Sequence, residues 1–519
     1  MYMTQGLRRG TKISPDGIAM VSQNGQFTWA ELQDRVARLT GALHGLSMRP
    51  EDRVAMLSYN SHRYAEYYYG TFWAGANVVP MNIRWSLAEH VYSINDSGAR
   101  FLIVDDAFAE MGASIARDCA SVEHVIFAGD GTCPEGMLPY EELIADAAPA
   151  EDAFRNGEDL AGIFYTGGTT GFPKGVMLPH RALWASSMCF AAGANLTPAD
   201  RMLHAPPLFH IAGVAMLLST TLFGGSHAFI PGFEPKAFLR GVTEMDSTVS
   251  LLVPTMIAML LQAPELEEAD TSKLTRLLYG ASPMTLAILR EAMDKMPETR
   301  FIHAYGQTEL APLATLLGSE YHVLEGPKAE KIRSVGQAVP CMEIEIVDAD
   351  GNEVPRGVAG EVRARGPNTM IGYWNKPEQT AETLRDGWVY TGDGGVMDED
   401  GFIYIVDRVK DMIISGGENI YSAEVENAIM QFPGLAECAV IGIPHDTWGE
   451  AVHAVVVPRE GQTPDPEAII AHCRELIAGY KCPRSIDVQT EPLQKSGAGK
   501  IQKFEIRKPF WEGRDRNVS

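Results

Sequence analysis

Cysteine is scarce in this sequence, with seven residues in 519 at wide spacing. The number is odd, and no C-x-x-C motif occurs. A disulfide framework and a cysteine-based zinc site are therefore disfavoured, and a reducing cytoplasm is the compartment that we expect. No cysteine stands in a context that indicates a nucleophile, so we expect these side chains to be small buried apolar groups.

Long apolar runs are also missing. The longest are residues 214–218 and 251–261, and Pro254 interrupts the second. Both fall far short of the about 20 residues that cross a bilayer, so they predict core elements and no transmembrane segment. Residues 1–16 are polar and basic, without the apolar centre of a secretory signal. Peripheral membrane contact through a surface patch stays open.

Basic residues are outnumbered by acidic ones, 43 to 67, which gives a net charge of −24 at pH 7. Such a chain is poorly suited to bind nucleic acid or an anionic membrane as its main partner. With 519 residues, 45% of them hydrophobic and 21% charged, the composition is that of a globular protein of two or more domains.

Strand-like and helix-like patterns alternate through the first 300 residues. Apolar runs at residues 53–57, 101–104 and 124–127 predict buried strands. Residues 31–46 have the apolar spacing of an amphipathic helix. This alternation predicts parallel sheets covered by helices, which is the α/β class.

The pattern changes in the second half of the chain. Residues 343–347 and 360–364 are short alternating runs separated by turns, which predict a small antiparallel sheet or barrel. A strand pattern at residues 401–406 precedes a compact α+β region, with a helix expected at 422–431 and a strand at 437–443.

A glycine-rich loop is the most informative segment. Residues 165–175 read YTGGTTGFPKG and follow an apolar run at residues 160–164. The N–H groups and hydroxyls of this loop and the ammonium of Lys174 could surround a polyphosphate after a buried strand. It is not a Walker A loop, because Gly175 stands where that motif needs Ser or Thr. Taken by itself, a flexible surface loop is the alternative.

Further motifs follow in order along the chain. They are residues 305–309 (YGQTE), 390–393 (YTGD), 407–411 (DRVKD), 414–420 (ISGGENI) and 495–501 (KSGAGKI). With the loop, the set resembles the signature of the adenylate-forming enzymes, which include acyl-CoA synthetases, peptide-synthetase adenylation domains and firefly-type luciferases. One departure is Gly167, which stands where many of these enzymes have Ser.

The resemblance implies an α/β fold of two domains. Residues 1–409 would form an N-terminal AMP-binding domain, built of helix-covered sheets and a small β-barrel-like subdomain. Residues 410–519 would form a small, mobile α+β lid. Lys410 matches the hinge of the lid, where a residue needs only to tolerate a large change in φ and ψ.

The resemblance also implies a reaction in two halves. A carboxylate attacks the α-phosphate of ATP, which gives an acyl adenylate and pyrophosphate. The thiol of coenzyme A then displaces AMP and forms a thioester. The cofactors implied are ATP, Mg²⁺ and coenzyme A as co-substrate. The task of the protein is to orient these groups and to neutralise their charge.

By motif match, Lys500, His210 and Lys410 are the residues expected to serve catalysis. Lys500 would bridge the carboxylate and the α-phosphate, where negative charge builds up. His210 would orient the carboxylate, and Lys410 would be the hinge. Outside the motifs, Lys500 would be interpreted as a solvated lysine and His210 as a structural histidine.

Residues from several motifs would hold the nucleotide. Glu309 would bind Mg²⁺ and Thr308 the α-phosphate. Tyr305 would stack on the adenine, while Asp393 and Arg408 would contact the ribose. The structural alternatives are an exposed carboxylate for Glu309, core packing for Tyr305 and a surface pair for Asp393. The remaining residues would surround the phosphates, the adenine and acyl groups or the pantetheine: Thr166, Gly167, Gly168, Thr169, Thr170, Lys174, Gly280, Ala281, Ser282, His303, Ala304, Gly306, Gly416 and Gly417.

Residues 208–213 bear on the substrate. They read LFHIAG and lack the carboxylate that amino-acid-activating relatives carry in this segment. A buried substrate ammonium would have no partner, so amino acids are disfavoured. We expect an acid–CoA ligase that acts on a fatty acid, with an aryl or hydroxycinnamate acid as the alternative.

Two other classes are weaker alternatives. A luciferase-like oxygenase would use the same adenylation step. A non-catalytic regulator that binds a nucleotide or acyl-CoA would be expected to have lost Lys500, Glu309 or Asp393, and all three are present. The exact acid, the pathway and the oligomeric state, a homodimer included, stay open.

Overall fold

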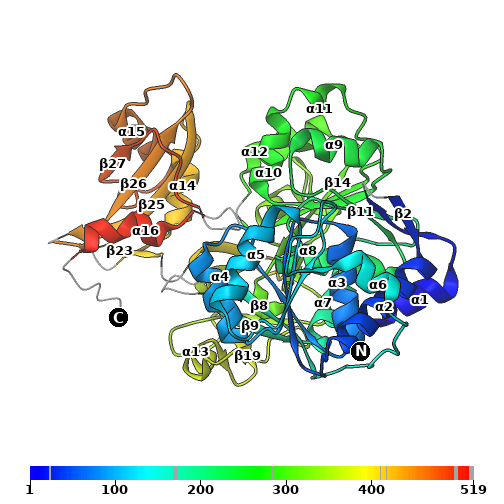
Figure 1. Cartoon of the computed structure of the whole chain (residues 1–519). Coiled ribbons are helices and arrows are strands. Elements are labelled where there is room, and N and C mark those ends of the chain that lie inside the picture. Colours follow the sequence, from blue (N-terminus) through cyan, green and yellow to red (C-terminus); the bar gives the residue numbers. More distant parts are fainter. Residues whose placement is uncertain are drawn as a thin grey trace. The chain divides into compact units, whose positions relative to one another are not determined.

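The computed structural model describes residues 1–22, 25–166, 173–282, 284–408, 411–415, 418–445, 447–495 and 501–512, with residues 407, 408, 418 and 419 described by their backbone only (Figure 1). The chain divides into two compact units. Unit 1 comprises residues 1–344 and 364–389, and unit 2 comprises residues 345–363 and 390–519.

Two large sheets form the frame of unit 1. In spatial order the nine-stranded sheet comprises β16 (Gln337–Ala338), β15 (Thr315–Leu317), β14 (Arg300–Tyr305), β13 (Arg276–Gly280), β12 (Val249–Leu252), β10 (Arg201–His204), β11 (Ser226–Phe229), β1 (Ile18–Ser22) and β2 (Gly25–Thr28). The eight-stranded sheet comprises β19 (Gly372–Tyr373), β9 (Lys174–Pro179), β8 (Leu160–Thr166), β4 (Asn77–Pro80), β3 (Arg53–Leu57), β5 (Phe101–Val104), β6 (His124–Phe127) and β7 (Leu138–Pro139). The three predicted strands β3, β5 and β6 are present and pair in parallel, as expected.

A layer of buried helices packs between the two sheets. It consists of α3 (His62–Trp73), α7 (His180–Gly193) and α8 (Ile211–Phe223). Every residue of α3 is buried, because this helix contacts β1 in one sheet and β3 and β4 in the other. Helix α7 contacts β8 and β9, whereas α8 contacts β10 and β11 and packs against α7.

Further helices surround these layers (Figure 1). They are α1 (Gln5–Ile13), α2 (Trp29–Gly45), α4 (Leu87–Ser97), α5 (Ala109–Asp118), α6 (Tyr140–Asp146), α9 (Pro235–Thr243), α10 (Pro254–Gln262), α11 (Glu265–Glu268), α12 (Leu286–Lys295) and α13 (Pro377–Thr383). Helix α2 begins two residues before the prediction, because Thr28 and Glu31 form a capping box that satisfies its first N–H groups.

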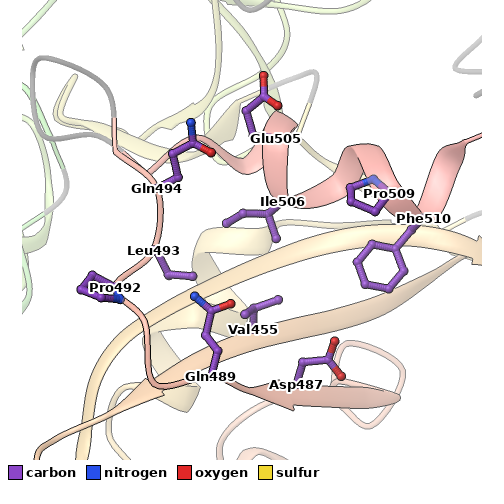
Figure 2. Close-up of a pocket in the computed structure, with 10 residues that line it drawn as sticks. All are labelled: Val455, Asp487, Gln489, Pro492, Leu493, Gln494, Glu505, Ile506, Pro509 and Phe510. Carbon is purple, nitrogen blue, oxygen red and sulfur yellow. The ribbon is translucent and has the colours of Figure 1, made fainter.

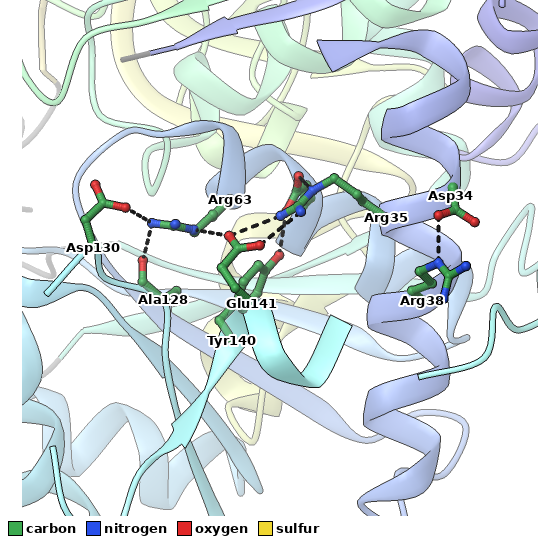
Figure 3. A network of polar contacts seen from close by, with 9 residues as sticks. Asp34, Arg35, Arg38, Arg63, Ala128, Asp130, Tyr140 and Glu141 are labelled. Atoms are coloured by element: carbon green, nitrogen blue, oxygen red, sulfur yellow. Dashed lines mark hydrogen bonds and ion pairs between the residues drawn. The ribbon is translucent and has the colours of Figure 1, made fainter. Parts of the chain in front are cut away.

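A buried network of charged side chains joins α2, α3 and α6 in unit 1 (Figure 3). Arg35 donates hydrogen bonds of 2.6 and 3.0 Å to the fully buried carboxylate of Glu66, and the Tyr140 hydroxyl donates another of 2.9 Å. Arg35 also pairs with Glu141, which accepts a hydrogen bond of 2.7 Å from Arg63. Because each buried charge has a partner of opposite sign, removal of one would leave another unpaired.

A small sheet contains β17 (Glu343–Val347), β18 (Ala359–Arg365), β21 (Trp388–Met397) and β20 (Leu384–Arg385), and β22 (Ile403–Arg408) pairs with β21. Strands β17 and β18 form at the two predicted runs, and β21 in the same sheet is antiparallel to both β20 and β22.

A further sheet lies entirely in unit 2 and contains β24 (Glu418–Ile420), β23 (Ile413–Ser415), β26 (Gly449–Pro458), β25 (Leu435–His445) and β27 (Ser485–Val488). It packs with α14 (Ser422–Ile429), α15 (Pro466–Leu476) and α16 (Lys503–Arg507). The predicted helix and strand of this region correspond to α14 and β25. A pocket of about 330 Å³ lies beside β26 and β27, and residues from the 492–494 and 505–510 segments complete its lining (Figure 2).

Candidate active site

The predicted phosphate loop connects the two strands of a hairpin. Strand β8 is antiparallel to β9, and Thr166 at the end of β8 pairs with Lys174 at the start of β9. Gly167, Gly168, Thr169 and Thr170 lie outside the described residues. The chain continues from the loop into a strand, so a helix N-terminus does not follow the loop directly. An anion there would depend on the N–H groups of the loop and on Lys174.

Lys174 and Glu309 both contact one aromatic side chain, that of Tyr373. The Lys174 Nζ lies 5.0 Å from the centre of the Tyr373 ring, a cation–π contact. The Tyr373 hydroxyl donates a hydrogen bond of 2.7 Å to Glu309 Oε1. The structure therefore brings together the residues predicted to bind phosphate and Mg²⁺, through a tyrosine that the sequence analysis did not identify.

Backbone pairing holds Tyr373 in this position. Strand β19 pairs with β9, where Tyr373 lies opposite Val176. The N–H of Trp374 donates to the carbonyl of Gly175 at 2.8 Å, and the N–H of Met370 donates to the carbonyl of Glu309 at 2.9 Å. Because Tyr373 is only 5% exposed, its ring has little freedom to move away from its two partners.

The turn after β14 presents Thr308 and Glu309. Gly306 has φ +156°, and a Cβ atom there would lie 1.8 Å from the carbonyl oxygen of Pro312. Only glycine fits so close to another backbone segment. A single turn of 3₁₀-helix, Thr308–Leu310, follows and leaves Thr308 buried and Glu309 half-buried. Tyr305, which ends β14, is also half-buried.

The predicted adenine wall lies on two neighbouring parallel strands. Gly280 at the end of β13 pairs with Ala304 on β14. A Cβ atom on Gly280 would lie 2.1 Å from the carbonyl oxygen of Ala304, so a glycine is needed here as well. Ala281 then turns the chain with φ +66°, and Ser282 is half-buried.

The side chain of His303 has a structural role in addition to the predicted backbone contact. Its ring stacks on Tyr279 at 4.5 Å between centroids, and Nδ1 lies 3.2 Å from the carbonyl oxygen of Ser334. Burial lowers the pKa of His303 to about 4, so the ring is neutral at pH 7 and Nδ1–H is the donor.

His210 is the N-cap of α8. Its Nδ1 accepts a hydrogen bond of 3.3 Å from the N–H of Ala212, in the manner of a capping side chain. Because Nδ1 is an acceptor, the neutral ring has its proton on Nε2, which can donate a hydrogen bond. The imidazole therefore has a fixed orientation, and its predicted action on the substrate carboxylate stays a prediction.

The two residues predicted to hold the ribose are direct neighbours in unit 2. Asp393 on β21 pairs with Arg408 on β22 across the antiparallel ladder. Asp393 is 8% exposed, and its N–H donates to the Thr391 hydroxyl at 3.1 Å. Gly392, with φ +69°, donates its N–H to Glu361 Oε1 at 2.9 Å. The side chain of Arg408 is not described, and Lys410, Gly416, Gly417 and Lys500 lie outside the described residues.

Tyr373 and a cysteine pair are the features that the sequence analysis missed. Tyr373 stands in the short segment 371–374 (IGYW), which has no spacing or composition that indicates a site. Cys189 and Cys341 lie with their sulfur atoms 3.1 Å apart, although 152 residue positions separate them. In both cases, only the pairing of distant segments creates the contact.

Comparisons with known proteins identify the family. The family model of AMP-binding enzymes matches residues 7–374, and that of the AMP-binding enzyme C-terminal domain matches residues 424–500. The chain is 39% identical over 503 residues to a feruloyl-CoA synthase of Amycolatopsis sp, covering 97% of this chain and 98% of that protein. It is 34% identical over 524 residues to a long-chain-fatty-acid–CoA ligase of Salmonella typhimurium, covering 95% and 91%.

A solved structure agrees with these relatives. The crystal structure of ATP-bound MatB from Rhodopseudomonas palustris has a TM-score of 0.88 and 31% identity, and the match covers 99% of each chain. The chain therefore belongs to the AMP-binding enzymes, the adenylate-forming superfamily. Within that superfamily it is an acyl-CoA synthetase, an AMP-forming acid–thiol ligase. Among the helices of the described residues, none is long and apolar enough to cross a membrane.

Proposed function

We propose that this ligase uses Mg-ATP to convert an apolar carboxylic acid into an acyl adenylate and then transfers the acyl group to coenzyme A. The observation that carries the proposal is the meeting of Lys174 and Glu309 at Tyr373. A cation and a carboxylate that contact the same side chain are suited to a metal-bound polyphosphate, because the cation neutralises phosphate oxygens and the carboxylate binds the metal.

The residues at Glu309 fit Mg²⁺. One Glu309 oxygen accepts the Tyr373 hydrogen bond, which orients the carboxylate. Among the described ranges of the chain, no group of three or more His, Cys, Asp or Glu is placed to hold a metal ion. A single protein carboxylate suits Mg²⁺, which takes its other ligands from substrate phosphates and water. Bound there, Mg²⁺ would neutralise charge on the phosphates.

Two lysines outside the described residues complete the proposal. Lys500 stabilises the charge that develops between carboxylate and α-phosphate, and Lys410 is the hinge between domains 1–409 and 410–519. Gly416 and Gly417 leave room for the pantetheine. The motifs at residues 407–411, 414–420 and 495–501 support the assignment, and the family model of the C-terminal domain extends to Lys500.

The variant Lys500→Ala tests its role. We expect pyrophosphate release to fall by about 100-fold or more, since a charge contact at the reacting oxygens contributes roughly 3 kcal/mol. Thioester formation from supplied acyl adenylate should change little. Lys508→Ala, further along the same tail, is the control. An equal loss in both half-reactions would contradict the assignment.

The identity of the acid substrate is a separate part of the proposal. The residues of the chain favour a fatty acid, with a hydroxycinnamate as the alternative. The fatty-acid ligase of Salmonella typhimurium, at 34% identity, supports the first. The feruloyl-CoA synthase of Amycolatopsis sp, at 39%, supports the second. Both acids are apolar chains or rings with one carboxylate, which agrees with the absence of an acidic residue in the 208–213 segment.

A substrate panel tests the function and separates the two acids. Pyrophosphate release from Mg-ATP is measured with long-chain fatty acids, ferulate and related aryl acids, and amino acids, each with and without coenzyme A. We expect the matching CoA thioester, identified by mass spectrometry, from a fatty or aryl acid and none from amino acids. Pyrophosphate release without thioester would contradict coenzyme A as the acceptor.

We also propose a cytoplasmic location. All seven cysteines lie in the described residues and are free thiols, which supports a reducing compartment. Cell fractionation with an antibody to the chain checks this, and recovery outside the cytoplasmic fraction would contradict it.

A further inference from the structure

Cys189 and Cys341 form a close thiol pair in unit 1. Cys189 lies on α7, and Cys341 lies on the segment between β16 and β17. A hydrogen bond joins the two sulfur atoms at 3.1 Å. A disulfide bond is about 2.05 Å long, so the two sulfurs need to approach by only about 1 Å to bond.

The surroundings of the pair favour reaction between the two thiols. Cys189 is 8% exposed and sits in an apolar cluster with Leu313, Val339 and Met342, while Cys341 is half-buried at its edge. All seven cysteines are described, and this is the one hydrogen bond between two thiols among them. Because the pair is largely buried, only small oxidants can reach it. Once Cys189 is oxidised, Cys341 is close enough to react with it.

Cys189 is the more acidic of the two. The hydrogen bond between the two thiols lowers the pKa of Cys189, against the opposing effect of burial. The same bond, together with burial, raises the pKa of Cys341. A lowered pKa favours the thiolate of Cys189, which is the nucleophilic form, while the raised pKa of Cys341 favours its protonated form.

We propose that Cys189 and Cys341 are an oxidation site, at which hydrogen peroxide forms a reversible disulfide between them. The Cys189 thiolate attacks one peroxide oxygen, the O–O bond breaks, and the hydroxide that leaves takes up a proton to become water. Cys189 is then a sulfenic acid. The sulfur of Cys341 attacks that of Cys189, the S–O bond breaks, and a second water leaves with the proton of Cys341.

The electron count balances. The two thiols lose two electrons and two protons in total, and one hydrogen peroxide becomes two water molecules. Dithiothreitol reverses the step by two thiol–disulfide exchanges and becomes a cyclic disulfide. A disulfide of this kind, formed transiently in response to an oxidant, is compatible with a reducing compartment.

The disulfide would link two segments of the apolar cluster that also contains residues next to the candidate site. The apolar cluster around Cys189 also contains Ala304 and Leu310, which flank the turn at residues 305–309. A covalent link across 152 residue positions restricts the unfolded chain, which raises stability. The oxidised form should therefore unfold at a higher temperature than the reduced form.

Peptide mapping of the full chain tests the proposal. The reduced protein is freed of reductant, treated with hydrogen peroxide, alkylated with N-ethylmaleimide and digested with trypsin. Cleavage after arginine yields fragments 182–201 and 334–356, each with one cysteine. We expect a disulfide to join these two fragments and the other five of the seven thiols to be alkylated. Alkylation of both Cys189 and Cys341 after peroxide treatment would overturn the proposal.

Two variants and one control extend the test. Cys341→Ser should show no joined fragments and no rise of the apparent Tm with peroxide, whereas the unaltered chain should gain roughly 5 °C. Cys189→Ser should behave in the same way and serves if the first variant does not fold. Cys133→Ser, whose thiol donates to the backbone carbonyls of Pro134 and Met137, should match the unaltered chain. An unchanged or lowered Tm in the oxidised unaltered chain would overturn the stabilising role. This inference does not depend on which acid the enzyme uses.

Discussion

The candidate site residues of unit 1 and of unit 2 are positioned in different ways. In unit 1, Lys174, Tyr373 and Glu309 come from three segments, and one hydrogen bond spans 64 residue positions. In unit 2, Asp393 and Arg408 are neighbours across a single hairpin. The first arrangement requires most of the unit to be folded, whereas the second requires only the correct register of two strands.

The charged side chains of the two units differ in burial. In unit 1, the carboxylate of Glu66 is fully buried and pairs with Arg35 and Tyr140 across helices. In unit 2, the half-buried Glu426 pairs with Lys503 at 2.7 Å and accepts a hydrogen bond of 2.7 Å from the backbone N–H of Val440. Because a fully buried charge depends more on its partners, loss of a charge should cost more stability at Glu66 than at Glu426.

The largest effect is expected from Glu309→Gln. The amide keeps the shape and loses the charge that would hold Mg²⁺, so pyrophosphate release should fall by about 100-fold or more, or roughly 3 kcal/mol. Glu320→Gln, the same substitution at an exposed position later in the sequence, is the matched control. Unchanged release at limiting Mg²⁺ would rule out Glu309 as the metal ligand.

Glu66→Gln should give the next largest effect, on stability. The neutral side chain would leave Arg35 without its buried counter-charge, and we expect a loss of about 3 kcal/mol in the free energy of unfolding. Denaturation with urea measures it. Asp34→Asn is the control, and Figure 3 shows its position. The Asp34–Arg38 pair is more exposed and should contribute less than about 0.5 kcal/mol to the free energy of unfolding. Equal losses in both variants would contradict the contrast between buried and exposed pairs.

The third prediction concerns acid. His227 in β11 lies 3.0 Å from His204 and 2.9 Å from the Thr221 hydroxyl, and burial lowers its pKa to about 3. The unfolded chain, with an ordinary histidine pKa near 6.5, binds more protons below that pH. The contribution of neutral His227 to the free energy of unfolding is therefore fully present above about pH 6.5 and is lost as pH falls toward 3.

His227→Gln should remove this share of the acid sensitivity, about 2 kcal/mol between pH 7 and pH 5. The measurement is the slope of the unfolding free energy against pH, which is independent of the stability of the variant at neutral pH. His44→Gln, at an exposed position of α2, should keep the original slope. The same slope in all three proteins would show that His227 does not titrate on unfolding in this range.

The smallest effect is expected from Tyr373→Phe. The ring stays beneath Lys174, but the hydrogen bond to Glu309 is lost, which is worth about 1.5 kcal/mol for a charged acceptor. The concentration of Mg²⁺ at half-maximal rate should rise about tenfold, with the maximal rate largely retained. Tyr59→Phe, an exposed tyrosine, should leave it unchanged. A fall in maximal rate with no change in the Mg²⁺ requirement would contradict a positioning role.

Elements whose structure depends on a local sequence pattern could be predicted most accurately. Three predicted strands, at residues 53–57, 101–104 and 124–127, have the predicted bounds, because continuous apolar runs between turns mark buried parallel strands. Helix bounds differed by a few residues, since caps such as Thr28 determine where a helix begins.

Contacts between distant segments could not be predicted in this way. The position of Tyr373 depends on the pairing of β19 with β9, and that of Cys341 on the packing of its segment against α7. No residue near either one reveals its partner. The expectation that cysteines serve only as buried apolar groups therefore overlooked the close thiol pair. The roles assigned to Lys500, Lys410 and the loop glycines stay predictions, because these residues lie outside the described ranges.

The close approach of Gly280 to Ala304 has a consequence for engineering of substrate range. A common way to narrow a binding site is to replace a glycine in its wall by a larger residue. At position 280 any side chain would collide with the Ala304 carbonyl before it reached a ligand, so that route would disrupt the sheet instead. Libraries that aim to alter acid selectivity should keep Gly280 and vary side chains that follow it, such as the half-buried Ser282.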